Sequence, residues 1–213
     1  MALLFNYIVK CSGWPIWMIK ARPKVYYEDK AVQGRTIKGP AIVMPNHTEV
    51  WDYAAMMFLF PRRILHCVVA ELMYEKNAFM AFLLRALGSV RVDRNNPDFA
   101  FIGKCTAILD QGGVVEFYPE AKIPEAGRTE LLPFKPSITY LALESGVPVI
   151  PVYTDGNYFG KGHNHIIIGK PIDVQQLYNE SLSEKENIAA ITETLRGKIH
   201  ELRDKLREEI QEN

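Results

Sequence analysis

The sequence predicts an α/β fold: a single domain with a central mixed sheet flanked by helices, extended by an N-terminal amphipathic helical hairpin and a C-terminal charged helix. Short apolar runs alternate with helical segments of about ten residues, which is typical of one buried sheet. The 213 residues are 48% hydrophobic, which is enough apolar material for a full core. We expect residues 1–30, 31–182 and 183–213 to form the membrane-surface segment, the domain and the C-terminal helix.

The overall composition narrows the classes of function. Lys and Arg together number 25 and Asp and Glu number 25, so the formal net charge is zero. A nucleic-acid-binding protein usually carries a basic excess, so we expect no nucleic-acid partner. Cys11, Cys67 and Cys105 are widely spaced and form no CxxC pair. We therefore expect reduced thiols in a cytosolic setting and no bound metal.

Residues 1–30 have a composition of their own. Aromatic residues occur there among aliphatic ones, with basic residues between them: Phe5, Tyr7, Lys10, Trp14, Trp17, Lys20, Arg22, Lys24, Tyr26 and Tyr27. Aromatic rings prefer the headgroup level of a bilayer, and basic side chains reach toward lipid phosphates. We therefore expect a short helical hairpin that lies in one leaflet. The alternative is a helix that packs on the domain.

No stretch of the sequence predicts a membrane span. A transmembrane helix needs about 20 mostly apolar residues in a row. Lys10 and the break at Gly13-Trp14-Pro15 interrupt residues 1–19, which also lack the features of a secretory signal. We expect a peripheral or monotopic protein at the cytoplasmic face of the cell membrane.

The expected strands and helices alternate along the domain. The strands are residues 41–44, 64–70, 90–92, 114–118, 149–153 and 165–168, and the helices are residues 52–60, 77–87, 96–110 and 135–145. Short apolar runs predict the strands. Pro61 ends the first helix, while Gly88 and Gly146 end the second and the fourth. Asn96 caps the third helix, and Pro97 occupies its first turn.

The segment 183–213 predicts a long charged helix. Ser183 and Glu186 form a capping box at its start. Apolar residues then recur at alternating spacings of three and four: Ile188, Ile191, Leu195, Ile199, Leu202, Leu206 and Ile210. Such a narrow apolar stripe packs on its own domain or forms a dimer seam, and we favour the first interpretation.

His47 and Asp52 are the first candidate catalytic residues. They lie just after the strand at 41–44, and α/β folds place ligands where strands end. An imidazole can take a proton from a hydroxyl when a carboxylate fixes its tautomer. On one helix the two side chains would diverge by roughly 140°, so the pair requires His47 in the loop and Asp52 at the start of the helix. The alternative is a surface histidine beside an acidic residue favoured by the helix dipole.

Two further strand ends carry residues that could bind a substrate. Arg94 could grip a phosphate through its planar guanidinium, or could form a local ion pair with Asp93. Glu120 and Lys122 follow Pro119. Glu120 could accept hydrogen bonds from acceptor hydroxyls and Lys122 could meet a phosphate, although each could also be a solvated surface charge.

Pro148 and Pro151 interrupt the apolar segment 147–152. Proline cannot donate to a sheet ladder, so the pair predicts an edge strand or a shaped wall of an apolar groove. The alternative is a strand entry with no role in a site.

In order and spacing, these segments resemble the four blocks of the glycerolipid acyltransferases of the lysophosphatidate acyltransferase type. The blocks of that family are Asn-His-x4-Asp, Gly-x4-Asp-Arg, Phe-Pro-Glu-Gly and an apolar Val-Pro-x-x-Pro. The matching residues are Asn46, His47 and Asp52; Gly88, Asp93 and Arg94; Tyr118, Pro119, Glu120 and Ala121; and Val147, Pro148 and Pro151. The resemblance covers about residues 35–155.

The resemblance implies a direct acyl transfer. His47 would deprotonate the acceptor hydroxyl, Asp52 would orient the imidazole, and the hydroxyl would attack the thioester of acyl-CoA or acyl-carrier protein. The acceptor would be lysophosphatidate and the product phosphatidate, in phospholipid synthesis. Arg94 and Glu120 would hold the glycerol-phosphate part, while the segment 147–152 would line the acyl site. The expected substrate-binding residues are Asn46, Arg94, Pro119, Glu120, Lys122 and Pro151, and no bound cofactor is expected.

The third block departs from the family pattern, which usually runs Phe-Pro-Glu-Gly-Thr-Arg. Ala121 replaces the glycine and Ile123 replaces the arginine, so another lysolipid or a non-phosphate acceptor is a close alternative. A non-catalytic lipid-binding protein is an alternative of another class. A metal hydrolase built on His163, His165 and Asp155 is a remote one, because no third ligand stands at a zinc-like spacing.

Overall fold

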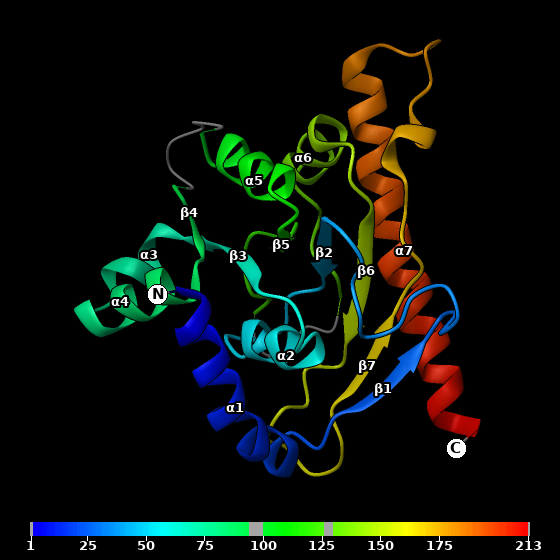
Figure 1. Ribbon diagram of the computed structural model, residues 1–213. Helices are drawn as coiled ribbons and strands as arrows, with labels where there is room; N and C mark the ends of the chain where they lie inside the picture. The colour runs from blue at the N-terminus through cyan, green and yellow to red at the C-terminus, as the bar shows by residue number, and fades with distance from the viewer. Residues whose placement is uncertain (1, 94–99, 126–129, 213) are drawn as a thin grey trace.

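The computed structural model describes residues 2–93, 100–125 and 130–212 (Figure 1). Seven strands in these ranges form one sheet in the order β1-β7-β6-β2-β5-β3-β4. Their bounds are β1 Lys24–Tyr27, β2 Ala41–Pro45, β3 Leu65–Ala70, β4 Val90–Val92, β5 Val114–Glu116, β6 Val149–Thr154 and β7 His165–Ile168. Neighbouring strands are parallel except β6 and β7. The predicted single α/β domain with a mixed sheet is confirmed.

Helices cover both faces of the sheet. Their bounds are α1 Ala2–Lys20, α2 Asp52–Leu59, α3 Glu71–Glu75, α4 Ala78–Leu87, α5 Ala100–Asp110, α6 Ser137–Ser145, the 3-10 helix η1 Val174–Leu177 and α7 Glu184–Glu212. Because side chains alternate along a strand, β2 faces two cores. Ile42 packs with residues of α5, α6 and α7, and Val43 packs with residues of α1 and α2. The expected start of α5 at residues 96–97 lies outside the described residues.

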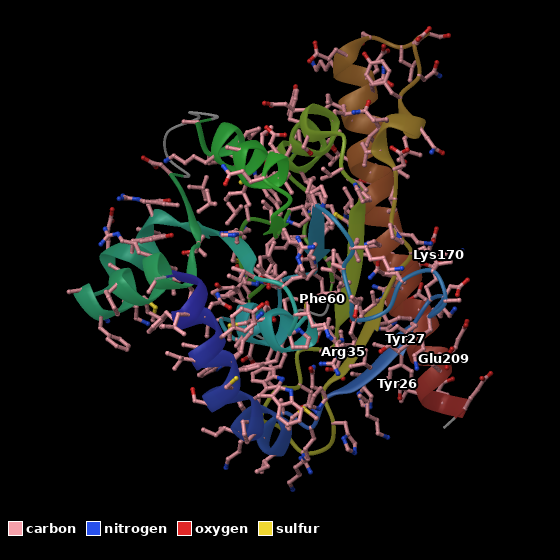
Figure 2. All side chains as sticks on the ribbon, viewed as in Figure 1. Tyr26, Tyr27, Arg35, Phe60, Lys170 and Glu209 are labelled. Carbon is pink, nitrogen blue, oxygen red and sulfur yellow. The ribbon has the colours of Figure 1, made fainter. Side chains whose placement is uncertain are left out.

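The N-terminal segment is one helix and one strand, so the predicted hairpin within residues 1–30 is wrong. α1 continues through Pro15 to Lys20. The chain then pairs residues 24–27 in parallel with β7, for example Tyr26 with Ile167. Figure 2 shows Tyr26 and Tyr27 on this strand. Pairing with an open sheet edge satisfies backbone groups that a second helix would have used internally, and the sheet therefore begins before residue 31.

The position of Lys10 in an aromatic segment predicted that its side chain reaches toward lipid phosphates, and this prediction is wrong. Lys10 is buried, and its Nζ donates to the carbonyl oxygens of Phe60, Pro61 and Arg63, just beyond the C-terminal end of α2. The free carbonyl groups at a helix C-terminus favour a cation there. Arg35 donates to the carbonyls of residues 58 and 59 in the same way. Burial lowers the pKa of Lys10 to about 8.

Helix α7 packs on its own domain, which is the interpretation that the sequence favoured over a dimer seam. The capping box is present, since the Ser183 backbone N–H donates to Glu186 and the Glu186 N–H donates to Ser183 Oγ. The buried residues of the stripe are Ile188, Ile191, Leu195, Ile199, Leu202 and Leu206. All of them except Ile188 join the core against the sheet, and Ile210 near the end of the helix is exposed, so most of the stripe is covered within the chain.

Pro151 lies in the interior of the sheet, so the predicted edge strand is wrong. β6 stands between β7 and β2. The Gly169 N–H donates to the Pro151 carbonyl, which shows that Pro151 faces the β7 side. The antiparallel pairing with β7 ends one step earlier, at Val152 and Ile168. The missing proline N–H therefore falls where no ladder bond is required. Gly169 makes room there, because a Cβ at that position would lie 2.7 Å from the proline ring.

Candidate active site

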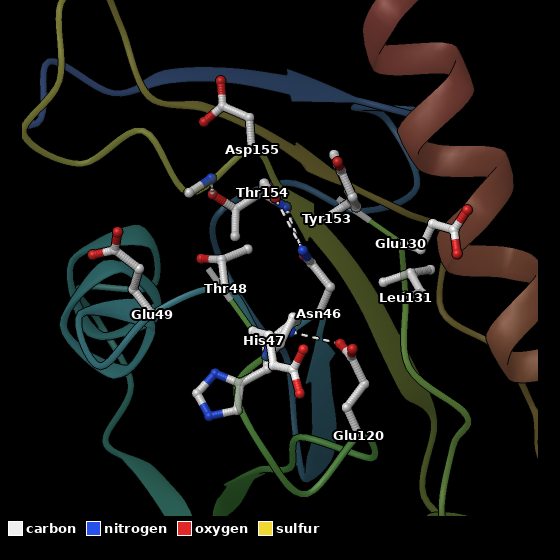
Figure 3. Close-up of a pocket in the computed structure, with 13 residues that line it drawn as sticks. Asn46, His47, Thr48, Glu49, Glu120, Glu130, Leu131, Tyr153, Thr154 and Asp155 are labelled. Atoms are coloured by element: carbon white, nitrogen blue, oxygen red, sulfur yellow. Dashed lines mark hydrogen bonds between the residues drawn. The ribbon is translucent and has the colours of Figure 1, made fainter. Parts of the chain in front are cut away.

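The carboxyl ends of β2, β5 and β6 meet at a pocket of about 330 Å³ (Figure 3). Open α/β sheets bind ligands in the crevice beyond the carboxyl ends of their strands. The lining residues are Asn46, His47, Thr48, Glu49, Glu120, Pro124, Glu125, Glu130, Leu131, Tyr153, Thr154, Asp155 and Gly156. The strand order therefore brings together segments that lie more than 100 residues apart in the chain.

His47 and Asp52 form the hydrogen-bonded pair that the sequence predicted. His47 lies in the loop after β2, and Asp52 is the first residue of α2. Nδ1 of the imidazole is 2.5 Å from Oδ2 of the carboxylate. The His47 side chain is 20% exposed and the Asp52 side chain 1% exposed. The acid is thus inside the protein, while the imidazole reaches the pocket.

The tautomer of His47 follows from its partner. An ionised carboxylate only accepts hydrogen bonds, so Nδ1 carries a proton and Nε2 presents a lone pair in the neutral ring. No hydrogen bond from a residue in the described ranges reaches Nε2. The imidazole is therefore braced on one side and able to accept a proton on the other.

Several donors hold the Asp52 carboxylate in one orientation. Oδ2 accepts from the backbone N–H groups of Thr48 and Glu49 at 2.6 and 2.9 Å. Oδ1 accepts from the Thr48 hydroxyl and from the Tyr158 hydroxyl, each at 2.6 Å. Gly156 permits this loop arrangement: its φ is 72°, and a Cβ there would lie 2.7 Å from Thr48 Oγ1.

Glu120 supports the backbone of the catalytic loop. Its Oε1 accepts from the His47 N–H at 2.7 Å (Figure 3), and its Oε2 accepts from the Leu132 N–H at 2.8 Å. The side chain is buried, and burial raises its pKa. The sequence predicted that Glu120 accepts hydrogen bonds from the hydroxyls of the acceptor, and that contact stays a prediction. In the structure Glu120 binds the backbone N–H groups of two loop residues.

Asn46 joins β2 to β6 through a reciprocal pair of hydrogen bonds. Its Nδ2 donates to the Thr154 carbonyl at 3.0 Å, and the Thr154 N–H donates to its Oδ1 at 2.8 Å (Figure 3). The side chain is buried. Asn46 therefore fixes the strand end from which His47 projects.

Glu116 is a part of the site that sequence analysis missed, and Tyr118, which was named only as a match to the third block, contacts the catalytic histidine. The Tyr118 ring lies 4.5 Å from the His47 ring, centroid to centroid. Its hydroxyl donates to Oε1 of Glu116, which is fully buried. Burial raises the pKa of Glu116 well above its usual value, and the negative charge of Asp52 acts in the same direction. A lone acid in the apolar run 114–117 was the available signal.

The remaining predicted substrate residues are dispersed. Pro119 and Pro151 are buried and do not line the pocket, and Lys122 is exposed outside the lining. Ala121 has a φ of 59°, the left-handed conformation that its family counterpart glycine adopts easily. Arg94 lies outside the described residues, so its predicted contact with a phosphate stays a prediction.

The histidines proposed for a metal hydrolase have other hydrogen-bond partners. His165 Nδ1 lies 2.8 Å from Asp155 Oδ2, and His163 Nδ1 lies 2.9 Å from the Arg22 carbonyl. Across the described part of the chain, no three His, Cys, Asp or Glu residues are grouped as metal ligands. Nothing in this arrangement favours the metal-hydrolase hypothesis.

Within the described ranges, every helix is too short or too polar to cross a bilayer. Helices α1 and α4 nevertheless expose apolar side chains. These are Leu4, Tyr7, Ile8, Trp14, Ile16 and Ile19 on α1, and Phe79 and Phe82 on α4. Phe5 contacts Phe82 edge to face at 6.1 Å, so the two helices lie together. We call these eight exposed side chains the α1–α4 apolar surface.

Comparison with known proteins gives one consistent family. The family model described as acyltransferase matches residues 22–155. A 1-acyl-sn-glycerol-3-phosphate acyltransferase of Bacillus subtilis (strain 168) is 29% identical over 153 residues, which are 70% of this chain and 73% of that protein. The human 1-acyl-sn-glycerol-3-phosphate acyltransferase beta is 25% identical over 53% of this chain and 40% of its own length. The chain thus spans less than half of this longer relative.

A solved structure supports the fold. The crystal structure of the 1-acyl-sn-glycerophosphate (LPA) acyltransferase PlsC from Thermotoga maritima matches 93% of this chain and 79% of that one, with a TM-score of 0.65 and 21% sequence identity. At this identity the similarity concerns the arrangement of the sheet and helices. The match extends beyond the residues of the family model and includes most of the terminal segments.

Proposed function

Because this chain belongs to the acyltransferase family, we propose that it transfers a fatty acyl group from a thioester donor to the free hydroxyl of a lysophospholipid at a membrane surface. The observation that carries the proposal is the His47–Asp52 pair at the edge of a pocket. The alternative of a non-catalytic lipid-binding protein would not require an imidazole with a braced Nδ1 and an open Nε2. We therefore favour an O-acyltransferase.

The chemistry assigned to the pair is general base catalysis. Nε2 of His47 takes the proton of the acceptor hydroxyl as its oxygen attacks the thioester carbonyl carbon. The carbon–sulfur bond then breaks, and the leaving thiolate takes the proton from the imidazolium. Asp52 stabilises the imidazolium and keeps its ring oriented. The products are an ester and a free thiol, and no acyl-enzyme forms.

Lysophosphatidate is the acceptor that we propose first, with phosphatidate as the product in phospholipid synthesis. The names of the relatives support this choice. Acyl-CoA and acyl-carrier protein both supply the required thioester. We assign the glycerol-phosphate contacts to Arg94, Glu120 and Lys122, while Asn46 lines the pocket and the buried prolines Pro119 and Pro151 support the backbone behind it.

Another lysolipid is the second candidate acceptor, and the third block favours it. Ile123 stands where the family has arginine, and it cannot bind a phosphate. The described lining also includes the acidic residues Glu49, Glu130 and Asp155 near His47, which disfavour a dianionic headgroup unless cations offset them.

We propose that the chain acts at the cytoplasmic face of the cell membrane and contacts it through the α1–α4 apolar surface. Phe79 and Phe82 are 70% and 59% exposed, and amphipathic helices with such side chains bind at the lipid interface. Trp51 and Phe159, which are exposed and 5.1 Å apart, continue the apolar exposure beside the catalytic loop. The free thiols of all three cysteines are typical of a reducing compartment.

The test is an acceptor panel with the purified chain in detergent. Palmitoyl-CoA or palmitoyl-acyl-carrier protein is mixed with lysophosphatidate, lysophosphatidylcholine, lysophosphatidylglycerol or monoacylglycerol, and products are identified by mass spectrometry. Phosphatidate formation supports the first acceptor. Turnover of another lysolipid, without phosphatidate formation, would show that this lysolipid and not lysophosphatidate is the acceptor. No turnover with any pair would contradict the enzyme proposal.

A further inference from the structure

We propose that Tyr158 is a positioning residue for the His47–Asp52 pair, and that helix α1 supports it through Trp17. This inference rests on the acyl transfer proposed above. It assigns the N-terminal helix a role in the geometry of the active site that is separate from any contact with lipid.

Tyr158 reaches Asp52 from the loop between β6 and β7. Its hydroxyl donates to Oδ1 of Asp52 at 2.6 Å, while Oδ2 of the same carboxylate faces His47. The tyrosine is 1% exposed, and burial raises its pKa well above the usual value. The phenol therefore keeps its proton and acts as a donor. It holds the carboxylate through the oxygen atom that does not bond to the imidazole.

The ring of Tyr158 packs against α1. Trp17 lies 5.4 Å from the Tyr158 ring and 5.4 Å from the Phe58 ring of α2, with which it stacks. Trp17 is 5% exposed, whereas Trp14 on the same helix is 45% exposed. The two tryptophans of α1 therefore occupy different environments. Trp14 is exposed to solvent, whereas Trp17 is buried against the ring of Tyr158, whose hydroxyl binds Asp52.

These contacts form a continuous line from α1 to the imidazole: Trp17, Tyr158, Asp52 and His47. A carboxylate held by several hydrogen bonds has little freedom to rotate, and orientation at the reacting centre contributes strongly to rate. Removing the Tyr158 hydroxyl leaves Oδ1 with the Thr48 hydroxyl as its remaining side-chain donor. We expect the carboxylate to rotate and the imidazole to lose part of its alignment.

Tyr158→Phe is the direct test, and Tyr53→Phe is its matched control. Tyr53 is also a tyrosine with a buried hydroxyl, but that hydroxyl has no hydrogen-bond partner within the described residues. For Tyr158→Phe we expect kcat to fall about 10- to 100-fold, the effect of losing one hydrogen bond to a charged group. We expect KM to stay within about twofold, because the acceptor does not contact this hydroxyl. Tyr53→Phe should keep the wild-type kcat.

A spectroscopic measurement separates positioning from folding and does not need activity. The imidazole Nδ1–H of a histidine bonded to a carboxylate gives a low-field proton resonance in NMR, which His47→Ala identifies by its loss. We expect Tyr158→Phe to shift or broaden this resonance, while Tyr53→Phe leaves it in place. An unmoved resonance together with a wild-type kcat in Tyr158→Phe would overturn the inference.

Trp17→Leu tests the part played by α1. In an assay with acceptor dispersed in detergent, membrane binding is not required, and we expect kcat to fall and the same resonance to broaden. A wild-type kcat and an unchanged resonance would contradict the role of α1. If the wild-type chain transfers no acyl group to any acceptor, the proposed function fails. The resonance comparison would still decide whether Tyr158 positions the pair.

Discussion

The Nδ1 atom of His47 lies 2.5 Å from the Oδ2 atom of Asp52, although the residues stand five positions apart in the chain. On a single helix their side chains would diverge by roughly 140°. The junction between the loop after β2 and the first turn of α2 removes that conflict. The same carboxylate also accepts from the backbone N–H groups of Thr48 and Glu49 in that loop, so Asp52 both holds the loop in place and orients the imidazole.

Asp52→Asn should lower kcat by at least about 100-fold, because the amide no longer stabilises the imidazolium and can favour the wrong tautomer. It should also lower the free energy of unfolding by about 1–3 kcal/mol, since an amide N–H₂ would face groups that are themselves donors. Steady-state kinetics and urea denaturation measure the two effects. Asp204→Asn, an exposed acid on α7, is the control and should change neither. A wild-type kcat in Asp52→Asn would contradict the assigned role.

Ala121→Gly should stabilise the protein by up to about 1 kcal/mol. Ala121 has a φ of 59°, and a left-handed conformation costs a non-glycine residue about 1–2 kcal/mol, which the larger chain entropy of glycine partly offsets. Urea denaturation gives the difference in unfolding free energy. Ala190→Gly, on the exposed surface of α7, should instead destabilise by about 1 kcal/mol. Destabilisation by both substitutions would show that no strain is relieved at Ala121.

Glu116→Gln should remove the part of the fall in unfolding free energy, as pH rises, that comes from the Glu116 carboxyl group. The pKa of Glu116 is raised above 4.5 in the folded protein, so above pH 4.5 the folded state holds a proton that the unfolded state releases. The contribution of this group is fully present below pH 4.5 and is lost as pH rises toward the folded value. The unfolding free energy of the wild type should therefore fall relative to Glu116→Gln as pH rises from 4.5. Parallel curves for the wild type and Glu116→Gln would contradict the raised pKa.

Phe79→Ser combined with Phe82→Ser should weaken binding to vesicles of phosphatidylglycerol and phosphatidylcholine. Both rings are exposed on α4, and each buried aromatic side chain contributes about 1.5–3 kcal/mol on transfer from water. Co-sedimentation with vesicles measures the loss. Leu182→Ser, an exposed apolar residue just before α7, is the control. Equal binding by the wild type and the double variant would remove α4 from the membrane contact.

The core elements could be predicted from the sequence because their signals are local. Gly88 and Gly146 adopt left-handed conformations at the ends of α4 and α6, as their positions predicted. Asn77, included in the second predicted helix, caps α4 through a hydrogen bond from the Met80 N–H. The His47–Asp52 geometry was also local, since it depended only on a strand, a loop and the start of a helix.

The parts that sequence analysis missed depend on distant partners. β1 exists because β7, more than 130 residues later, offers a parallel edge. The hydroxyl of Tyr158 meets Asp52 across 106 positions, and neither residue type nor spacing signals that contact. Lys10 carries a charge that predicted a position near lipid headgroups, but the carbonyl groups beyond α2 bind it instead. Each case required knowledge of which segments the sheet brings together.

The initial rate of acyl transfer by His47→Ala tests the central claim most directly. The rate is measured with the acceptor that the wild type uses, beside His163→Ala as a control from the loop before β7. A positioned general base contributes about 10²- to 10⁴-fold, so we predict a loss of that size for His47→Ala, with vesicle binding unchanged and with His163→Ala at the wild-type rate. A wild-type rate in His47→Ala would contradict the claim that this imidazole takes the proton from the acceptor.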